Sequence, residues 1–421
     1  MNIKAIIAWC VYDWGLTAFP VIVNTFVIAA YFTSKIAVDK IVGTHQWGNA
    51  IALAGIIIAL LSPVLGTIAN NNGKLKIWLA FFTLLVSMSS CLLWFAYPGS
   101  ASVHLTLVCV ALGTIGVNVS MIFYNSLLVD IAPEEYTGRV SGWGWGLGYF
   151  GGLAVLIIIL YGLINNPPTW LNSATFAQIR LCGPLVGLWV LLFAIPLFLM
   201  VPDRSIAHFG LGHAVRTSIR DLGRTLKMVW QQKNIVKFLL AQMIYIDGLN
   251  TLFAFGGIYA AGTFQMPLKE ILALGIAMNV FAGVGSIALA WLDDYCGAKF
   301  TILLSLALLS LTTLCNAVVV EKQLFCALAC LGSVFVGPIQ SSSRTLMMHI
   351  IPKEKATQLF GLYVFSGKAS TFIGPWIFGL MTLEFNSQRA GLGALLLFFA
   401  VGALVLWFVR EQTTGDGFTV T

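Results

Sequence analysis

Charged side chains are scarce in this sequence. Only 9% of its 421 residues are charged, whereas 59% are hydrophobic and the mean hydropathy is +0.91. A soluble domain carries about 25% charged residues, so this chain cannot build a surface suited to water. The scarcity excludes an ordinary soluble protein and predicts that lipid is the main solvent. The net charge of +7 does not indicate nucleic-acid binding, because the basic residues lie in short segments between apolar runs.

The apolar runs also lack the alternation of apolar and polar residues that a membrane-spanning barrel requires. Segments such as 51–61 and 392–409 are apolar throughout. Lipid offers no water to satisfy exposed backbone groups, so only helices and closed barrels can span it. We therefore expect an all-α membrane protein.

Motifs of catalytic and metal sites are missing as well. No Gly-x-Ser-x-Gly or His-Glu-x-x-His occurs, the five histidines are scattered, and the eight cysteines lie in or beside apolar segments. The Gly-x-Gly-x-x-Gly pattern at 146–151 follows no strand, so it lacks the context of a dinucleotide site. We expect no enzyme, no cofactor and no metal. A channel is also disfavoured, because no pore-loop segment is repeated.

Twelve segments are long and apolar enough to span a membrane, which takes about 20 residues. The longest polar stretch, from Pro202 to about Lys237, separates six spans from six. We therefore expect an N-terminal six-helix bundle (1–201), a cytoplasmic linker (202–235) and a C-terminal six-helix bundle (236–421). The predicted spans are 5–32, 46–69, 77–97, 103–128, 141–163, 180–201, 236–262, 270–292, 299–319, 322–348, 357–381 and 390–409.

The basic residues predict the orientation of these spans. With the N-terminus inside, fifteen Lys and Arg residues fall on the cytoplasmic side and six on the outer side. The positive-inside rule then places both termini and the linker in the cytoplasm. Within the linker, Arg216, Arg220 and Arg224 recur every four residues beside an apolar face. This pattern predicts an amphipathic helix attracted to anionic lipid, with a regulatory partner site as the alternative.

Three segments of the first half recur in the second half in the same order. This repetition predicts two pseudo-symmetric six-helix bundles, an architecture found in secondary transporters. The matching pairs are the Asp-x-x-x-Thr segments at 13–17 and 247–251, the loops at 66–74 and 290–299, and the loops at 133–142 and 352–361.

The loop at 66–74 resembles the signature between helices 2 and 3 of the major facilitator superfamily. In that resemblance Asn70 replaces the signature's acid, while the second copy keeps the acid as Asp294. The acid is expected to help a latch between the bundles on the cytoplasmic side, so Asn70 should weaken it. The residues predicted for these gating loops are Gly66, Asn70, Gly73, Asp294 and Gly297.

Three longer stretches are more specific. They are 9–32 with Tyr-Asp-Trp, 124–152 with Ser-Gly-Trp-Gly-Trp-Gly, and 340–375 with Phe-Gly-Leu-Tyr and Ser-Gly-Lys-Ala-Ser. Together they resemble the autophagy-related vacuolar effluxer branch of that superfamily, as a bacterial-type member. The resemblance covers essentially the whole chain. It implies a major facilitator fold with a central cavity lined by helices 1, 4, 7 and 10, and alternating access. The fungal members are associated with amino-acid efflux.

Four charged residues fall inside predicted spans. Asp13 and Asp247 occupy matching places in the two halves, while Arg344 and Lys368 lie in the tenth and eleventh spans. A buried acid of this kind predicts substrate contact or proton coupling, with a structural polar clamp as the alternative. We expect Asp247 to pair with Lys368, leaving Arg344 as the freer cation that anchors an anionic group, unless internal salt bridges lock this half. The other predicted site residues are Tyr12, Tyr124, Asn125, Tyr245 and Gln340.

These features predict a monomeric secondary active transporter in a bacterial-type inner membrane. It should move a small anionic or zwitterionic solute, such as an amino acid, with proton coupling. A lipid or lysolipid flippase and a non-transporting sensor on the same scaffold are the alternatives. Saturable, gradient-dependent uptake of a small solute favours the transporter, and activity on bilayer lipid alone favours the flippase.

The predicted orientation can be tested by labelling. A cysteine introduced at His213 should react only with reagents that reach the cytoplasm, because the linker is predicted to be inside. A cysteine introduced at Gly99 should react from outside. Labelling of both positions from the same side of the membrane would contradict the twelve-span topology.

Overall fold

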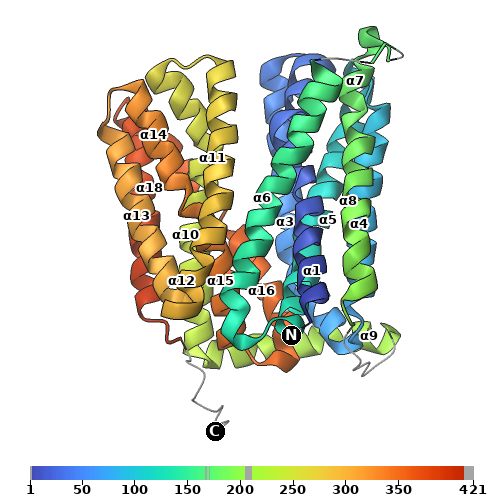
Figure 1. Ribbon diagram of the computed structural model, residues 1–421, viewed down its shortest axis with the longest axis vertical. Helices are drawn as coiled ribbons and strands as arrows, with labels where there is room; N and C mark the ends of the chain where they lie inside the picture. Colours follow the sequence, from blue (N-terminus) through green and yellow to red (C-terminus); the bar gives the residue numbers. More distant parts are fainter. Residues whose placement is uncertain (1, 166–167, 170, 204–210, 412–421) are drawn as a thin grey trace. The chain divides into compact units, whose positions relative to one another are not determined.

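Helices are the only regular elements in the described part of the chain. The computed structural model describes residues 2–165, 168–169, 171–203 and 211–411. All of its regular elements are helices (Figure 1), as the apolar runs predict. Within these residues, eleven segments are long and apolar enough to cross a membrane. The remaining predicted span, 357–381 and eleventh in order, is interrupted at 370–372 and forms two shorter helices, α16 (Ala356–Ala369) and α17 (Ile373–Glu384). The structure is consistent with the twelve-helix prediction.

Several other spans are also built from more than one helical piece. The first span changes to a π-helix at Pro20, where the missing N–H of proline removes an α-helical hydrogen bond. The remaining bounds are α1 Ile3–Leu16, η1 Pro20–Phe26, α2 Ile28–Tyr31, η2 Phe32–Ile36, α3 Lys40–Asn72, α4 Leu75–Leu92, α5 Val103–Ile131, α6 Thr137–Ile159, α7 Ala177–Arg180, α8 Cys182–Met200, α9 Leu211–Gln231, α10 Lys233–Phe264, α11 Leu268–Ala288, α12 Ala290–Cys296, α13 Ala298–Val318, α14 Lys322–Ser333, α15 Val336–Ile350 and α18 Gln388–Trp407.

The chain divides into two compact units. The N-unit comprises Asn2–Ile131 and Leu147–Val215, and the C-unit comprises Ala132–Gly146 and the chain from Arg216. In the N-unit, α4 packs on α5 and α8, and α1 packs on α8. In the C-unit, α10 packs on α18, and α13 packs on α15 and α18. The start of α6 belongs to the C-unit because its residues contact Asp294 of α12 and Arg344 of α15.

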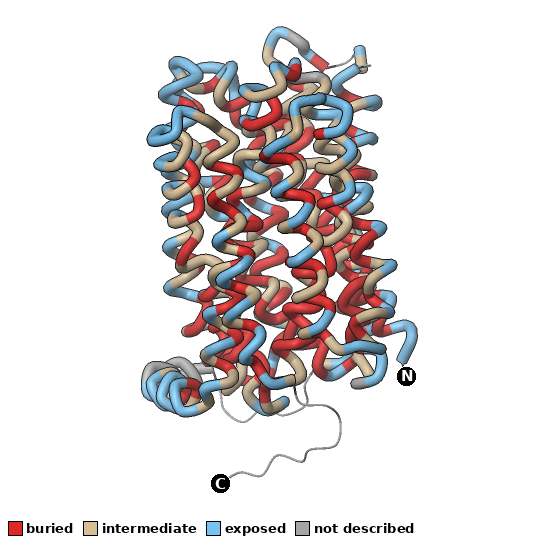
Figure 2. Tube along the Cα trace, turned by 90° about the vertical axis from the view of Figure 1, so that its left-hand side faces the viewer, coloured by how far each residue is buried: buried red, intermediate tan, exposed pale blue. Residues whose placement is uncertain are grey.

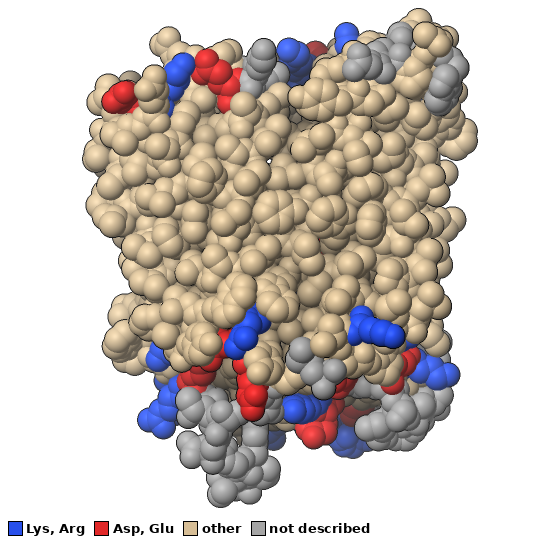
Figure 3. Space-filling model, in the orientation of Figure 1, with Lys and Arg blue, Asp and Glu red and all other residues tan. Residues whose placement is uncertain are grey.

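The outward surfaces of the helices are apolar. Buried and exposed residues alternate around each helix (Figure 2), and exposed positions include Leu60 (67%) and Leu199 (77%). On the face seen in Figure 3, charged side chains gather near the ends of the helices and leave a wide band without charge. Large apolar side chains exposed over such a band are suited to contact with lipid tails.

The predicted linker helix is present as α9, most of which belongs to the C-unit and runs across the direction of the long helices of that unit (Figure 1). Arg224 and Trp230 of this helix are exposed, while Val229 is buried. The side chain of Arg216 lies outside the described residues. A helix is therefore present in the predicted linker, and its attachment to lipid stays a prediction.

Glycines allow close helix approach at matching places in the two units. A Cβ built on Gly148 of α6 would lie 2.9 Å from Thr17 Oγ1, and one on Gly374 of α17 would lie 2.1 Å from Thr251 Oγ1. Thr17 and Thr251 are the threonines of the repeated Asp-x-x-x-Thr segments. In both units the fifth span of a half thus presents a glycine to the first span. This correspondence supports the predicted repeat.

The tighter of the two contacts gives a stability prediction. Gly374→Ala should destabilise the protein by about 1–3 kcal/mol, the scale of overpacking, because the new Cβ meets Thr251 Oγ1 and Asp247 Oδ1. Gly379 lies in the same helix with no atom within 4 Å of a built Cβ, so Gly379→Ala is the matched control. Thermal unfolding in detergent should show a lowered Tm for the first variant alone. Equal Tm values for the two variants would contradict the tight contact.

Candidate functional site

Asp13 is buried inside the N-unit, with 2% of its surface exposed. The hydroxyl of Tyr124 in α5 donates to its Oδ2 across 3.5 Å, which is long for a hydrogen bond. Gly148 of α6 approaches from another direction, since a Cβ there would lie 3.3 Å from Oδ1. Thr17 Oγ1 donates to the Asp13 backbone carbonyl at 2.9 Å. The carboxyl therefore has a polar neighbour on α5 and a close backbone on α6.

An aromatic stack fixes Tyr124 in place. Trp9 lies parallel to the Tyr124 ring with centroids 4.2 Å apart, and its Nε1 donates to the Tyr124 carbonyl at 2.8 Å. Tyr12 packs on the same ring at 5.3 Å, and its hydroxyl bonds to Thr83 Oγ1 at 2.8 Å. Asn125 follows on α5 and is buried. Tyr12 and Tyr124 thus hold α1 against α4 and α5, and contact of either with a substrate stays a prediction.

Asp247 is buried in the C-unit, with 1% of its surface exposed. Its Oδ2 accepts a hydrogen bond from the backbone N–H of Gly374 at 3.0 Å. The first N–H groups of a helix have no partner within that helix, so Asp247 caps the start of α17. Its Oδ1 is buried and accepts no hydrogen bond from the described residues. As in the N-unit, the threonine one turn later donates to the aspartate carbonyl, here from Thr251 at 2.8 Å.

The ion pair predicted between Asp247 and Lys368 is absent. Lys368 lies in the last turn of α16 and is half-buried, and no hydrogen bond or ion pair joins its ammonium to any described residue. Asp247 is instead held at the start of α17. On the same side of α10, Ser370 Oγ donates to the Met243 carbonyl at 3.1 Å. These bonds hold the interruption at 370–372 against α10 without involving the lysine.

Arg344 is also buried, with 2% exposed, and its contacts differ from those predicted. Its Nε donates to Ser141 Oγ at 2.9 Å and its Nη2 to the Ser141 carbonyl at 2.6 Å. The guanidinium lies 5.9 Å from the Trp145 ring centroid. Arg344 therefore ties α15 to the first turns of α6, so it is an engaged cation rather than a freer one. Gln340, one turn earlier, is half-buried.

Tyr245 lies in α10 two residues before Asp247, much as Tyr12 lies in α1 one residue before Asp13. Its hydroxyl bonds to Ser343 Oγ at 2.6 Å, and the side chain is fully buried. A Cβ on Gly402 of α18 would lie 2.9 Å from the Tyr245 Cβ. The tyrosine packs among helices of its own unit, and its contact with a substrate stays a prediction.

Asp294 of α12 binds the start of α6. Its Oδ1 accepts from the Gly138 N–H at 2.7 Å, and its Oδ2 accepts from Arg139 Nε at 2.5 Å. The Arg139 guanidinium also lies over the rings of Tyr136 and Tyr295, at 4.5 and 5.8 Å. The carboxylate thus satisfies a helix N-terminus and an arginine together. Asp294 and Arg139 thus form a charged contact, and its role as a latch stays a prediction.

The first copy of the gating loop is mostly helical. Gly66 and Asn70 lie within α3, which continues to Asn72, so they are not loop residues as predicted. Gly73 ends the helix with a φ of 71°, in the left-handed region that favours glycine. The amide oxygen of Asn70 is buried and accepts no hydrogen bond from the described residues. An aspartate at position 70 would be less favourable than the asparagine, because no described donor bonds to the side-chain oxygen there.

Gly297 of the second copy has a φ of +91° and lies against Glu411, which follows α18. The Glu411 carboxylate accepts from the N–H groups of Ala298 at 2.8 Å and Lys299 at 3.0 Å, and so caps α13. Burial by itself raises the pKa of Glu411, but the hydrogen bonds from His349 and the two N–H groups outweigh it. The pKa therefore lies below its usual value.

The sequence did not indicate several partners of these charges. Ser141, Gly374 and the Gly138 N–H each come from a helix distant in sequence from the charge they contact. A four-residue glycine repeat at 144, 148 and 152 signals close helix packing. Gly148 does pack closely, but the repeat gives no information about which side chain it meets.

Residues 130–415 match the family described as "Vacuole effluxer Atg22 like". The chain is 29% identical over 413 residues to the uncharacterized MFS-type transporter YxiO of Bacillus subtilis, covering 97% of this chain and 95% of YxiO. It is 27% identical over 298 residues to autophagy-related protein 22 of Cryptococcus neoformans, covering 66% of this chain. Because that alignment covers 51% of the fungal protein, the chain spans about half the length of this relative.

Solved structures show the same fold. The proton:xylose symporter XylE superposes with a TM-score of 0.76 at 13% identity, covering 97% of this chain and 96% of XylE. The transporter FucP superposes with a TM-score of 0.76 at 15% identity, covering 98% of this chain and 99% of FucP. These relatives are transporters rather than enzymes, and they support a secondary transporter. Since the family match covers more than half of the sequence, this multi-pass membrane protein belongs to the Atg22-like vacuole effluxer family of the major facilitator superfamily.

Proposed function

We propose that the protein moves a small anionic or zwitterionic solute, such as an amino acid, across a bacterial inner membrane by alternating access coupled to protons. The observation that carries the substrate class is the Lys368 ammonium, which has no hydrogen-bond or ion-pair partner among the described residues. A cation at the centre of a membrane helix costs roughly 2.5–3.5 kcal/mol on insertion scales. A solute carboxylate that neutralises Lys368 would recover part of this cost.

The surroundings of Lys368 fit a binding site. The lysine lies just before the interruption at 370–372, between α16 and α17. Discontinuous helices form substrate and ion sites in other transporters, because their free backbone ends are available to a ligand. Asp247 holds the start of α17 through one oxygen, while its other oxygen accepts no hydrogen bond from the described chain. The nearby acid would suit the amino group of a zwitterion.

Proton coupling is assigned to the two aspartates. The Tyr124 hydroxyl donates to Asp13 and the Gly374 backbone N–H donates to Asp247, and both of these donors are neutral. A carboxyl held by neutral groups can gain a proton without leaving a charged partner unpaired. The contact between Asp294 and Arg139 would open and close during alternating access, and Asn70 would weaken the corresponding contact of the first copy. The protein would act as a monomer.

The proposal can be tested by transport in proteoliposomes with Asp13→Asn. In the wild type, a gradient of one pH unit should support about tenfold accumulation of the solute if one proton moves with each solute. Asp13→Asn should keep solute exchange but lose this accumulation, because an amide carries no titrating proton. Asp39→Asn is the matched control, since Asp39 caps α3 at its start and asparagine caps a helix equally well.

Small carboxylates and amino acids should be taken up in preference to cations of the same size. Proton-driven accumulation by Asp13→Asn at the wild-type level would show that Asp13 is not the coupling group. Saturable uptake of cations alone would contradict the assignment of Lys368.

A further inference from the structure

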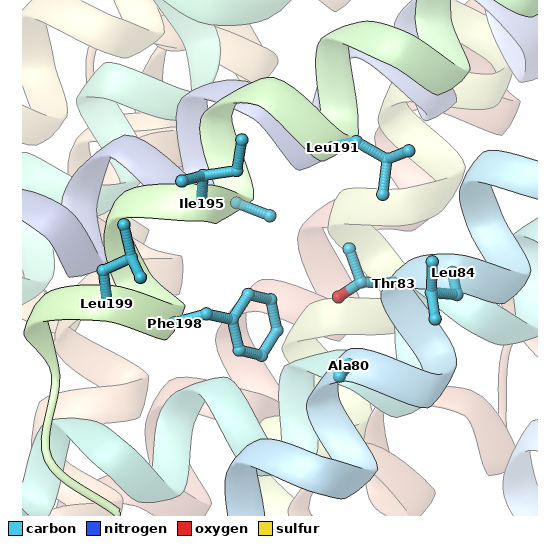
Figure 4. A pocket seen from close by; sticks show the side chains of 8 residues that line it. Ala80, Thr83, Leu84, Leu191, Ile195, Phe198 and Leu199 are labelled. Atoms are coloured by element: carbon cyan, nitrogen blue, oxygen red, sulfur yellow. The ribbon is translucent and has the colours of Figure 1, made fainter.

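A groove runs between α4 and α8 of the N-unit (Figure 4). Its volume is about 330 Å³, and its lining includes Ala80, Thr83 and Leu84 of α4 and Leu191, Ala194 and Phe198 of α8. The helices that line it belong to the third and sixth predicted spans. The groove is distinct from the residues assigned to the solute and the protons.

The groove is apolar and faces away from the interior of its unit. Leu84 is 49% exposed and Leu199, at one end of the lining, is 77% exposed. Thr83 is the one lining residue with a side-chain hydroxyl, and that hydroxyl is already bonded to the Tyr12 hydroxyl and the Leu79 carbonyl. The lining therefore offers no polar group to an occupant. An apolar chain fits this groove, whereas a polar solute would leave its own groups unsatisfied.

One end of the groove carries positive charge. Lys76, in the first turn of α4, donates from Nζ to the carbonyls of Phe198 and Val201, each at 2.7 Å. An ammonium has three N–H donors, so one donor remains beyond these two bonds. Lys74 lies just before α4 and is exposed. The Asp203 carboxylate also lies here and accepts from the Lys76 backbone N–H at 3.4 Å. The segments 74–76 and 201–203, which meet at this end, together carry two lysines and one acid.

We propose that this groove binds an anionic phospholipid, with one acyl chain between α4 and α8 and the phosphate at Lys76 and Lys74. Ala80 follows Lys76 by four residues, or about 6 Å along the helix, so the charged end adjoins the apolar lining directly. The occupant must be apolar along the helices and anionic at this end. A phospholipid of the leaflet on the lysine side has this chemistry and is always present beside a membrane protein.

The site can be tested with a phosphatidylglycerol probe that carries a photoreactive diazirine in its acyl chain. In nanodiscs of neutral lipid, crosslinks should concentrate in residues 79–84 and 191–199. Unlabelled phosphatidylglycerol should compete better than phosphatidylcholine of the same chain length. Lys74→Gln should reduce this preference by about fivefold, the contribution of one basic residue at an anionic surface. This variant leaves the Lys76 bonds to the two carbonyls in place.

Filling the groove gives an independent test. Ala80→Phe with Ala194→Phe should abolish the concentrated crosslinks, and Leu192→Phe, at an exposed position of α8 outside the lining, should preserve them. Crosslinks spread evenly over the lipid-facing helices would overturn the proposal, as would equal competition by the two lipids in the wild type. An unchanged pattern in the filled variant would also overturn it. If the filled variant does not fold, the Lys74→Gln competition decides the question.

Discussion

A charge inside a bilayer needs a partner, and this requirement organises the structure. Only 9% of the residues are charged, yet Asp13, Asp247 and Arg344 are each at most 2% exposed. Each of the three is held by a hydroxyl or a backbone group of another helix. The charges therefore specify which helices lie together. The apolar side chains around them would pack nearly as well in other arrangements, because lipid tails are as apolar as leucine.

The hydrogen bonds of the buried charges also matter for transport. Asp247 is held by a backbone N–H, which is a neutral donor, so a change of its protonation would alter a hydrogen bond and not a buried ion pair. Asp247 connects such a change directly to backbone structure, since its partner is the N–H of Gly374 at the start of α17. Lys368 lies on the other side of the same interruption. A proton and a solute could therefore act on one discontinuous span from its two sides.

Much of the architecture could be predicted from the sequence. The spans follow from the apolar runs, and the repeated Asp-x-x-x-Thr segments lie at corresponding places in the two units. The interruption at 370–372 was not evident, because the segment 357–381 is apolar on both sides of it. The pairing of Asp247 with Lys368 was wrong because it relied on depth alone. A helix that is apolar all round gives no periodic signal for the direction in which one polar side chain points.

The contacts of Tyr12 and Tyr245 could not be predicted for the same reason. Tyr12 and Tyr245 precede the aspartates, and adjacent or nearly adjacent residues on a helix point in different directions. In the structure both hydroxyls are bonded inside their own unit, to Thr83 and Ser343. The contacts of Gly148 with Asp13 and of Gly374 with Asp247 could not be predicted either, since a glycine has no side chain that could indicate what it contacts.

The most direct test of the account measures whether Lys368 binds an anionic solute. Thermal unfolding of the purified protein should be followed with a panel of small carboxylates, amino acids and cations. A ligand at a hundred times its Kd should stabilise the wild type by about 2.7 kcal/mol. This stabilisation should be lost in Lys368→Met and partly kept in Lys368→Arg. It should be unchanged in Lys322→Met, which removes an exposed lysine paired with Glu270. Equal stabilisation of Lys368→Met and the wild type by the same carboxylate would contradict the account.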